Sequence, residues 1–73
     1  MNAKGGWSVE MSLDNLPFGK RLKVVRVAQG LSQADVAQRV GISENRLCKF
    51  ETGRAQPRPD ELGRLRRLFN APL

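Results

Sequence analysis

Residues 30–53, which read GLSQADVAQRVGISENRLCKFETG, are the most informative stretch of this chain. The stretch predicts two short helices joined by a glycine turn. Ser32 opens the first helix, because a serine side chain accepts hydrogen bonds from the free backbone N–H groups of a first turn. Gly41 ends that helix, since glycine tolerates the left-handed backbone that reverses the chain. Ser43 caps the second helix in the same way.

Apolar spacing assigns a buried face to each of these helices. In the first helix, apolar residues three apart predict a single buried stripe of Ala34, Ala37 and Val40. The second helix, predicted over residues 44–52, places Leu47 and Phe50 on one side together with Ser43, so this side is expected to face the core. The opposite arc has no large apolar group and contains Glu44, Asn45, Cys48, Lys49 and Thr52.

The outer arc of the second helix combines a carboxylate (Glu44), an amide (Asn45) and an ammonium group (Lys49). These groups pair with cytosine, adenine and guanine edges in the major groove of DNA. A solvated helix face has a similar composition. Two interpretations of this arc therefore remain, a surface that reads bases and a surface that faces water.

The chain resembles the Cro and phage-repressor family of helix-turn-helix domains, also called XRE-like. The matching segments are FGKRLKVVR (18–26), GLSQADVAQRVGIS (30–43), FETG (50–53), and Pro57 followed by Leu62 and Leu65. The resemblance covers residues 17–69, and its LSQ, GIS and E-x-G spacing is fairly specific. It implies an all-α fold, a compact four- to five-helix lambda-repressor-like domain, in which residues 44–52 form the recognition helix in the major groove.

The resemblance also implies roles for individual residues. Contacts to double-stranded DNA are expected from Gln33, Ser43, Glu44, Asn45, Arg46, Cys48, Lys49, Arg54 and Arg58. Gln33 matches a position that binds a phosphate, and Arg46 is expected at the rim of the groove. Arg26 and Glu51 match positions that form a partly buried ion pair, for which we expect a structural role rather than catalysis.

Three of these expected contacts have an alternative interpretation. Glu44 would be repelled by phosphates, so it either excludes wrong sequences or serves as a favourable charge at a helix N-terminus. Arg54 and Arg58 either contact the DNA backbone or are solvated loop residues.

Composition is consistent with a small basic domain. The 73 residues predict one domain, with a net charge of +6. Residues 17–73 hold twelve Lys or Arg against five Asp or Glu, whereas residues 1–16 carry a charge of −1. Such a domain attracts polyanions, although basicity alone would suit RNA or an acidic membrane equally well.

Other functional classes lack their signatures. The sequence has no His and one Cys, and no nucleophile with a base in a recognisable motif, so we expect no enzyme, no metal and no cofactor. No small-molecule ligand is evident. No apolar run reaches ~18 residues and no secretory segment begins the chain, which predicts a cytoplasmic protein without a membrane span. Cys48 is interpreted as a small residue that fits, with a redox switch as the alternative.

Two further helices are expected to supply the scaffold. The first covers residues 18–29 and the last covers residues 59–69, where proline suits a first turn because its missing N–H needs no partner there. Their expected core residues are Phe18, Leu22, Val25, Leu62, Leu65 and Phe69.

The segment before the helices, residues 1–16, is expected to be an extension to the domain at residues 17–73. Its apolar residues alternate with polar ones, which predicts a strand that would need a partner edge. A flexible arm with chance alternation is the alternative. Apolar residues expected at a dimer interface or partner contact are Trp7, Val9, Met11, Leu13, Val24, Val27, Leu68 and Leu73.

The sequence therefore predicts a sequence-specific DNA-binding transcriptional regulator. In its simplest form this is a dimeric repressor that binds a palindromic operator, because two reading heads related by a two-fold axis recognise an inverted repeat. The alternative is an antitoxin or another protein-interaction module of the same fold that acts with a partner protein.

Overall fold

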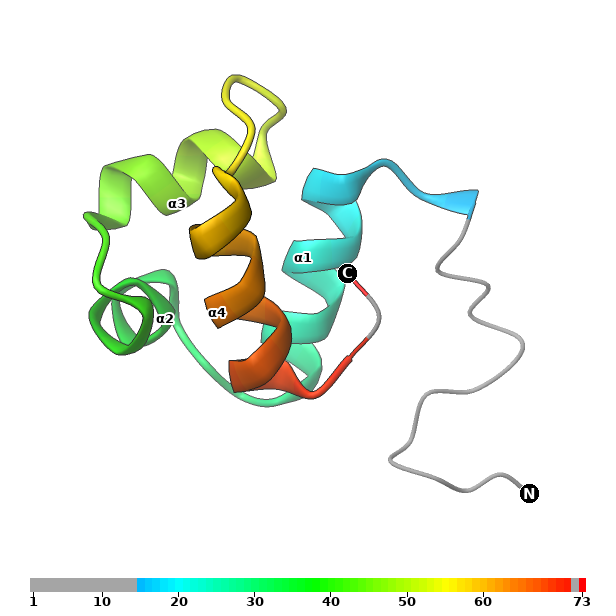
Figure 1. Ribbon diagram of the computed structural model, residues 1–73. Helices are drawn as coiled ribbons and strands as arrows, with labels where there is room; N and C mark the ends of the chain where they lie inside the picture. Colours follow the sequence, from blue (N-terminus) through cyan, green and yellow to red (C-terminus); the bar gives the residue numbers. More distant parts are fainter. Residues whose placement is uncertain (1–14, 72) are drawn as a thin grey trace.

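The structure is a computed structural model that describes residues 15–71 and 73 (Figure 1). Within this part the chain forms four helices, which are α1 (Phe18–Ala28), α2 (Gln33–Val40), α3 (Glu44–Glu51) and α4 (Pro59–Phe69). This confirms the expected all-α class. The alternating segment around residues 7–13 lies outside the described residues, so the strand and the arm both stay predictions.

The residues predicted to start and end the helix pair lie at the ends of α2 and α3. Ser32 Oγ accepts a hydrogen bond from the Asp35 N–H at 3.0 Å, and the Asp35 carboxylate accepts one from the Ser32 N–H at 3.0 Å. This reciprocal capping box satisfies two donors at the start of the helix. Gly41 has a φ of 75°, in the left-handed region, at the turn. Ser43 Oγ accepts from the Arg46 N–H at 3.0 Å and thereby caps α3, and the Ser43 residue is exposed rather than turned to the core.

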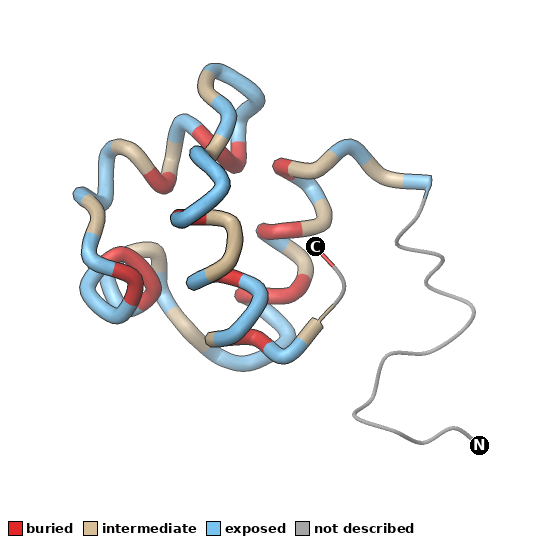
Figure 2. Tube along the Cα trace, viewed as in Figure 1, coloured by how far each residue is buried: buried red, intermediate tan, exposed pale blue. Residues whose placement is uncertain are grey.

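The apolar core lies between the helices, as the buried segments in Figure 2 show. It consists of Leu22, Val25, Val36, Ala37, Val40, Leu47, Phe50, Leu65, Phe69 and Leu73. One expectation was wrong, because Ala34 is exposed while Val36 is fully buried. At about 100° per residue, Val36 and Val40 lie one turn apart on one face, and Ala34 falls on the opposite side of the helix. Phe18 and Leu62 are only partly buried against this core.

Helix α1 crosses the C-terminal end of α3 at Gly19. A Cβ atom at Gly19 would lie 2.5 Å from the Phe50 carbonyl oxygen and 2.8 Å from that of Glu51. Real Cβ atoms do not approach backbone oxygens so closely, so this crossing requires glycine. The position of α3 against α1 is therefore fixed by backbone contact.

The end of the described chain folds back onto the helices. Leu73 is 7% exposed within the core, and its carbonyl accepts a hydrogen bond from Arg66 Nε at 2.9 Å. Gln29 Nε2 donates to the carbonyl of Phe69 at 3.0 Å and ties α1 to α4. Leu73 therefore fills the core and is not available to a dimer interface, which corrects the expectation for this residue.

Candidate nucleic-acid interface

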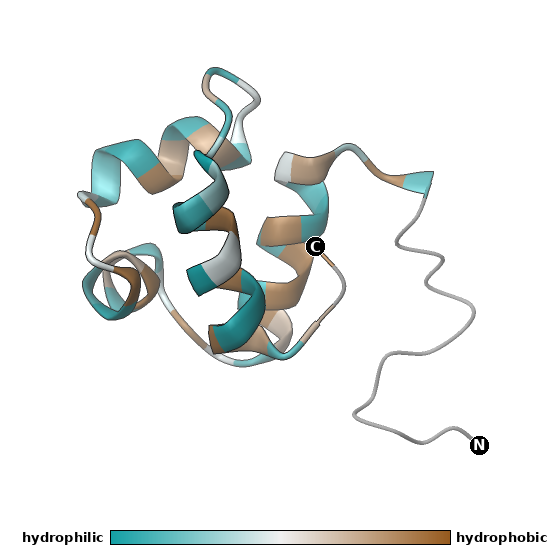
Figure 3. Ribbon diagram, in the orientation of Figure 1, coloured by the Kyte–Doolittle hydropathy of each residue, from teal (hydrophilic) through white to brown (hydrophobic). Residues whose placement is uncertain are grey.

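Helix α3 turns a polar face away from the core. Leu47, Phe50 and Glu51 are buried, whereas Glu44 and Lys49 are exposed. Asn45 and Thr52 are exposed on the same arc, and Cys48 is half-buried beside them. Figure 3 shows α3 largely in the hydrophilic colour. The described part of the chain therefore presents a carboxylate, an amide and an ammonium group on its surface.

A buried ion pair joins the end of α3 to α1. Arg26 Nε donates to Glu51 Oε2 at 2.6 Å and Arg26 Nη2 donates to Glu51 Oε1 at 3.0 Å, so the pair is bidentate. The two side chains are 11% and 2% exposed. The hydrogen bond with Glu51 raises the pKa of Arg26 above its ordinary value, against the opposing effect of burial. Arg26 Nη1 also donates to the Leu31 carbonyl at 2.9 Å, so the guanidinium holds three elements together.

Gln33 shares this network instead of standing free. Its Nε2 donates to Glu51 Oε1 at 3.0 Å. An amide nitrogen carries two N–H groups, so one donor remains for a ligand such as a phosphate. The bond to Glu51 fixes the direction in which that donor points.

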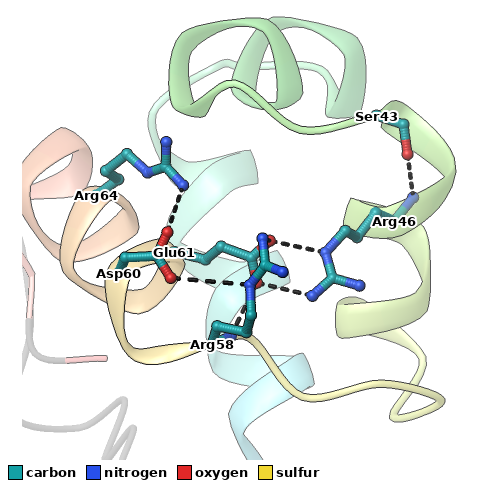
Figure 4. Close-up of polar contacts among 6 residues, drawn as sticks. All are labelled: Ser43, Arg46, Arg58, Asp60, Glu61 and Arg64. Carbon is teal, nitrogen blue, oxygen red and sulfur yellow. Dashed lines mark hydrogen bonds and ion pairs between the residues drawn. The ribbon is translucent and has the colours of Figure 1, made fainter.

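Arg46 lies on a different side of α3 from the exposed arc. It donates from Nε and Nη2 to the two carboxylate oxygens of Glu61 on α4, at 2.8 Å each (Figure 4). Its guanidinium also lies over the Phe50 ring, 4.9 Å from the centroid. The charge of Arg46 is therefore shared with Glu61 on α4 while its side chain is 35% exposed, and its place at the groove rim stays a prediction.

Glu61 connects α3, the following loop and the start of α4. Besides Arg46, it accepts a hydrogen bond from the Arg58 backbone N–H at 2.8 Å. It is 1% exposed. The hydrogen bond from Arg46 lowers the pKa of Glu61 from 4.5 to about 2, with help from the Arg58 N–H and against the effect of burial. The carboxylate is thus charged at neutral pH and holds the loop against the helix.

The loop between α3 and α4 presents two arginines. Arg54 is exposed, and its backbone N–H donates to the Lys49 carbonyl at 2.8 Å after the left-handed Gly53, whose φ is 78°. Arg58 is also exposed, and it lies 3.5 Å from a Glu61 oxygen and 3.8 Å from an Asp60 oxygen. Part of the charge of Arg58 is therefore already balanced, while within the described residues the Arg54 side chain has no ion pair.

Sequence reasoning missed Glu61 altogether. The available signal was its position, since an acid at the third residue of a helix often bonds the N–H of the residue that precedes the helix. Its second partner, Arg46, is fifteen residues earlier and no local pattern predicts that contact.

In the described part of the chain, no cluster of three or more His, Cys, Asp or Glu could hold a metal ion. None of the helices in that part is both long and apolar enough for a membrane span.

Comparison with known proteins places this sequence in a family. The profile of the family described as "Helix-turn-helix domain" matches residues 17–73. The HTH-type transcriptional regulator ImmR of Bacillus subtilis (strain 168) is 34% identical over 55 residues, which are 75% of this chain and 43% of that protein. The chain thus corresponds to less than half the length of this relative. No solved structure matches the chain. The chain belongs to the helix-turn-helix domain family and is an XRE-like member of it.

Proposed function

We propose that this protein is a sequence-specific DNA-binding regulator of transcription. The observation that carries the proposal is the exposed arc of α3, where Glu44, Asn45 and Lys49 are exposed while the opposite face is held by the core. A helix of this kind, preceded by a second helix and a tight turn, docks in the major groove with its N-terminal residues at base edges. The similarity to a transcriptional regulator points in the same direction.

The base-reading residues are proposed from the exposed arc. Lys49 donates to guanine, and Asn45 forms a bidentate pair with adenine. Glu44 accepts from cytosine or rejects other bases, while Cys48 and Ser43 lie beside the groove. These contacts supply sequence preference, and each is worth ~1–3 kcal/mol of discrimination at one base pair.

Phosphate contacts position the helix in the groove. We assign them to the free N–H of Gln33, to Arg54 and to Arg58. Gln33 begins α2, so the partial positive charge of the helix N-terminus adds to its donor. These contacts carry no sequence information, and they make binding dependent on salt.

The active form is proposed to be a dimer that represses a promoter by occupying a palindromic operator. A single helix of eight residues reaches few base pairs, and two copies related by a two-fold axis would double the site. Val27 is 57% exposed on α1 and Val24 is half-buried, so both remain candidates for the contact between copies. Leu68 packs partly against the core, so only part of its side chain is available for a contact between copies.

Selection of bound sites from random duplex DNA at physiological salt tests this function. We expect an enriched inverted repeat. Lys49→Ala and Asn45→Ala should each relax the preference at one base position of the half-site. Arg54→Ala should instead weaken binding to all sequences alike, and it should reduce the slope of log affinity against log salt concentration by roughly one. Lys23→Ala is the matched control, because it removes one exposed cation from α1 and leaves every residue of α3 unchanged.

Two results would contradict the proposal. Absence of any enriched sequence above salt-sensitive background would exclude sequence reading by this chain. If a sequence is enriched but every α3 variant keeps the same base preference as the wild type, another surface reads the DNA. The first result would favour the protein-interaction module over the regulator, whereas the second would refute the assignment of base reading to α3.

A further inference from the structure

A shallow hollow lined by arginines lies between α2 and α4. It has a volume of about 340 Å³ and is lined by Arg39, Arg64, Arg67 and Leu68. All three arginines are exposed, and Leu68 is half-buried among them. We call these four residues the arginine hollow. It brings three positive charges from two helices to one place without an acid among the residues that line it.

The arginines of the hollow are only partly balanced by acids. Arg64 Nη2 donates to Asp60 Oδ2 at 3.0 Å (Figure 4). Arg39 is attracted to Asp35, one turn earlier on α2, without forming an ion pair. Within the described residues, Arg67 has neither an ion pair nor a side-chain hydrogen bond. Like charges gathered in this way oppose folding slightly, which is offset when an anion binds.

The arginine hollow lies away from the exposed arc of α3. Helix α4 packs against the other side of α3, where Arg46 bonds to Glu61. Arg39 follows Gln33 by six residues, which is about 9 Å along the axis of α2. A duplex centred on the outer arc therefore does not need these three arginines.

We propose that the arginine hollow binds an acidic segment of a partner protein. Carboxylates of the segment bond to the guanidiniums of Arg39 and Arg67, and one apolar side chain of the segment packs on Leu68. Arg64 is already bonded to Asp60 within α4, so Arg39 and Arg67 are the residues assigned to the carboxylates of the segment. An apolar contact among the cations suits a peptide that mixes acidic and apolar residues better than it suits a phosphate backbone. The proposal does not depend on DNA reading by α3.

A double substitution with a charge-matched control tests the proposal. The probe is a fluorescein-labelled peptide of alternating glutamate and leucine, and its affinity is measured by fluorescence anisotropy. Arg39→Gln with Arg67→Gln should lower the affinity about tenfold, because two exposed ion pairs with the peptide are lost. Lys20→Gln with Lys23→Gln removes two exposed charges from α1 and should change the affinity less than twofold. Thermal melts establish that both variants are folded.

A second set of measurements separates the peptide from other anions. Affinity for a 20-base-pair duplex should fall no further in the arginine variant than in the lysine variant. A larger loss of duplex affinity in the arginine variant would assign the hollow to DNA and overturn the proposal. Equal losses of peptide affinity in the two variants would show attraction by net charge alone and would also overturn it. A peptide with serine in place of leucine should bind more weakly, and equal binding would refute the contact with Leu68.

Discussion

Replacement of Glu61 by glutamine tests the cluster of Arg46, Arg58 and Glu61, which joins α3 to α4. The substitution keeps the size of the side chain and an acceptor for the Arg58 N–H, but it removes the charge that Arg46 binds through two hydrogen bonds of 2.8 Å. Each pKa unit corresponds to about 1.4 kcal/mol, so lowering the pKa of Glu61 from 4.5 to about 2 corresponds to about 3 kcal/mol. The Arg46 side chain is 35% exposed and partly screened, which reduces the expected loss to about 1–2 kcal/mol.

Thermal unfolding followed by circular dichroism measures this loss. In a domain of this size, about 1–2 kcal/mol lowers Tm by roughly 4–16 °C at neutral pH. The pKa of Glu61 is lower in the folded protein, so its contribution is complete above pH 4.5 and disappears as the pH falls towards 2. The difference between wild type and Glu61→Gln should therefore be largest at neutral pH and small near pH 2.

Asp60→Asn is the control, because Asp60 is an exposed neighbour that pairs with Arg64 and Arg58. Its loss should stay within about 0.5 kcal/mol. A Glu61→Gln variant as stable as wild type at neutral pH would refute the assignment of an energetic role to the cluster. A loss of equal size at pH 7 and near pH 2 would show that packing, and not ionisation, is responsible.

Four further substitutions test other parts of the domain by the same melts. Glu51→Ala leaves the buried charge of Arg26 without its partner and should lower the free energy of unfolding by ~3–5 kcal/mol. An unchanged Tm would refute the structural role of the pair. Gly19→Ala should destabilise the protein by more than about 1 kcal/mol, since the added carbon meets two carbonyl oxygens, whereas Gly63→Ala in open space on α4 should stabilise it by up to ~1 kcal/mol. Equal effects at the two glycines would contradict the backbone contact. Ser32→Ala removes an N-cap and should cost ~1 kcal/mol, and no change in Tm would show that the capping bond is not needed.

Local signals in the sequence were sufficient for the helix pair. The serines at 32 and 43 and the glycine at 41 act through bonds and backbone angles of their immediate neighbours, so their effect can be read without the rest of the fold. The predicted ranges for the first and third helices each run one residue too far, because Gln29 and Thr52 are the residues that end them. The exposed arc of α3 followed from helical periodicity alone, since Leu47 and Phe50 fix which side is buried.

Non-local contacts were the part that sequence reasoning could not supply. The resemblance implies a place at the groove rim for Arg46 from its position in α3, whereas a carboxylate fifteen residues later determines where its guanidinium points. The predicted buried face of α2 was chosen by the spacing of Ala34, Ala37 and Val40 alone. Side-chain size was not considered, so the face omitted Val36. A valine buries more apolar surface than an alanine, so the helix turns Val36 inward.

The two ion pairs have a common consequence for the proposed reading helix. Helix α3 has eight residues, and an isolated helix shorter than ~12–15 residues is marginal in water. Its shape and direction are therefore set by its neighbours. Arg26 holds it at the last residue through Glu51, and Glu61 holds its first turn through Arg46. If α3 reads bases as proposed, a change in either pair would alter this reading through the orientation of α3, even though neither pair lies on the exposed arc.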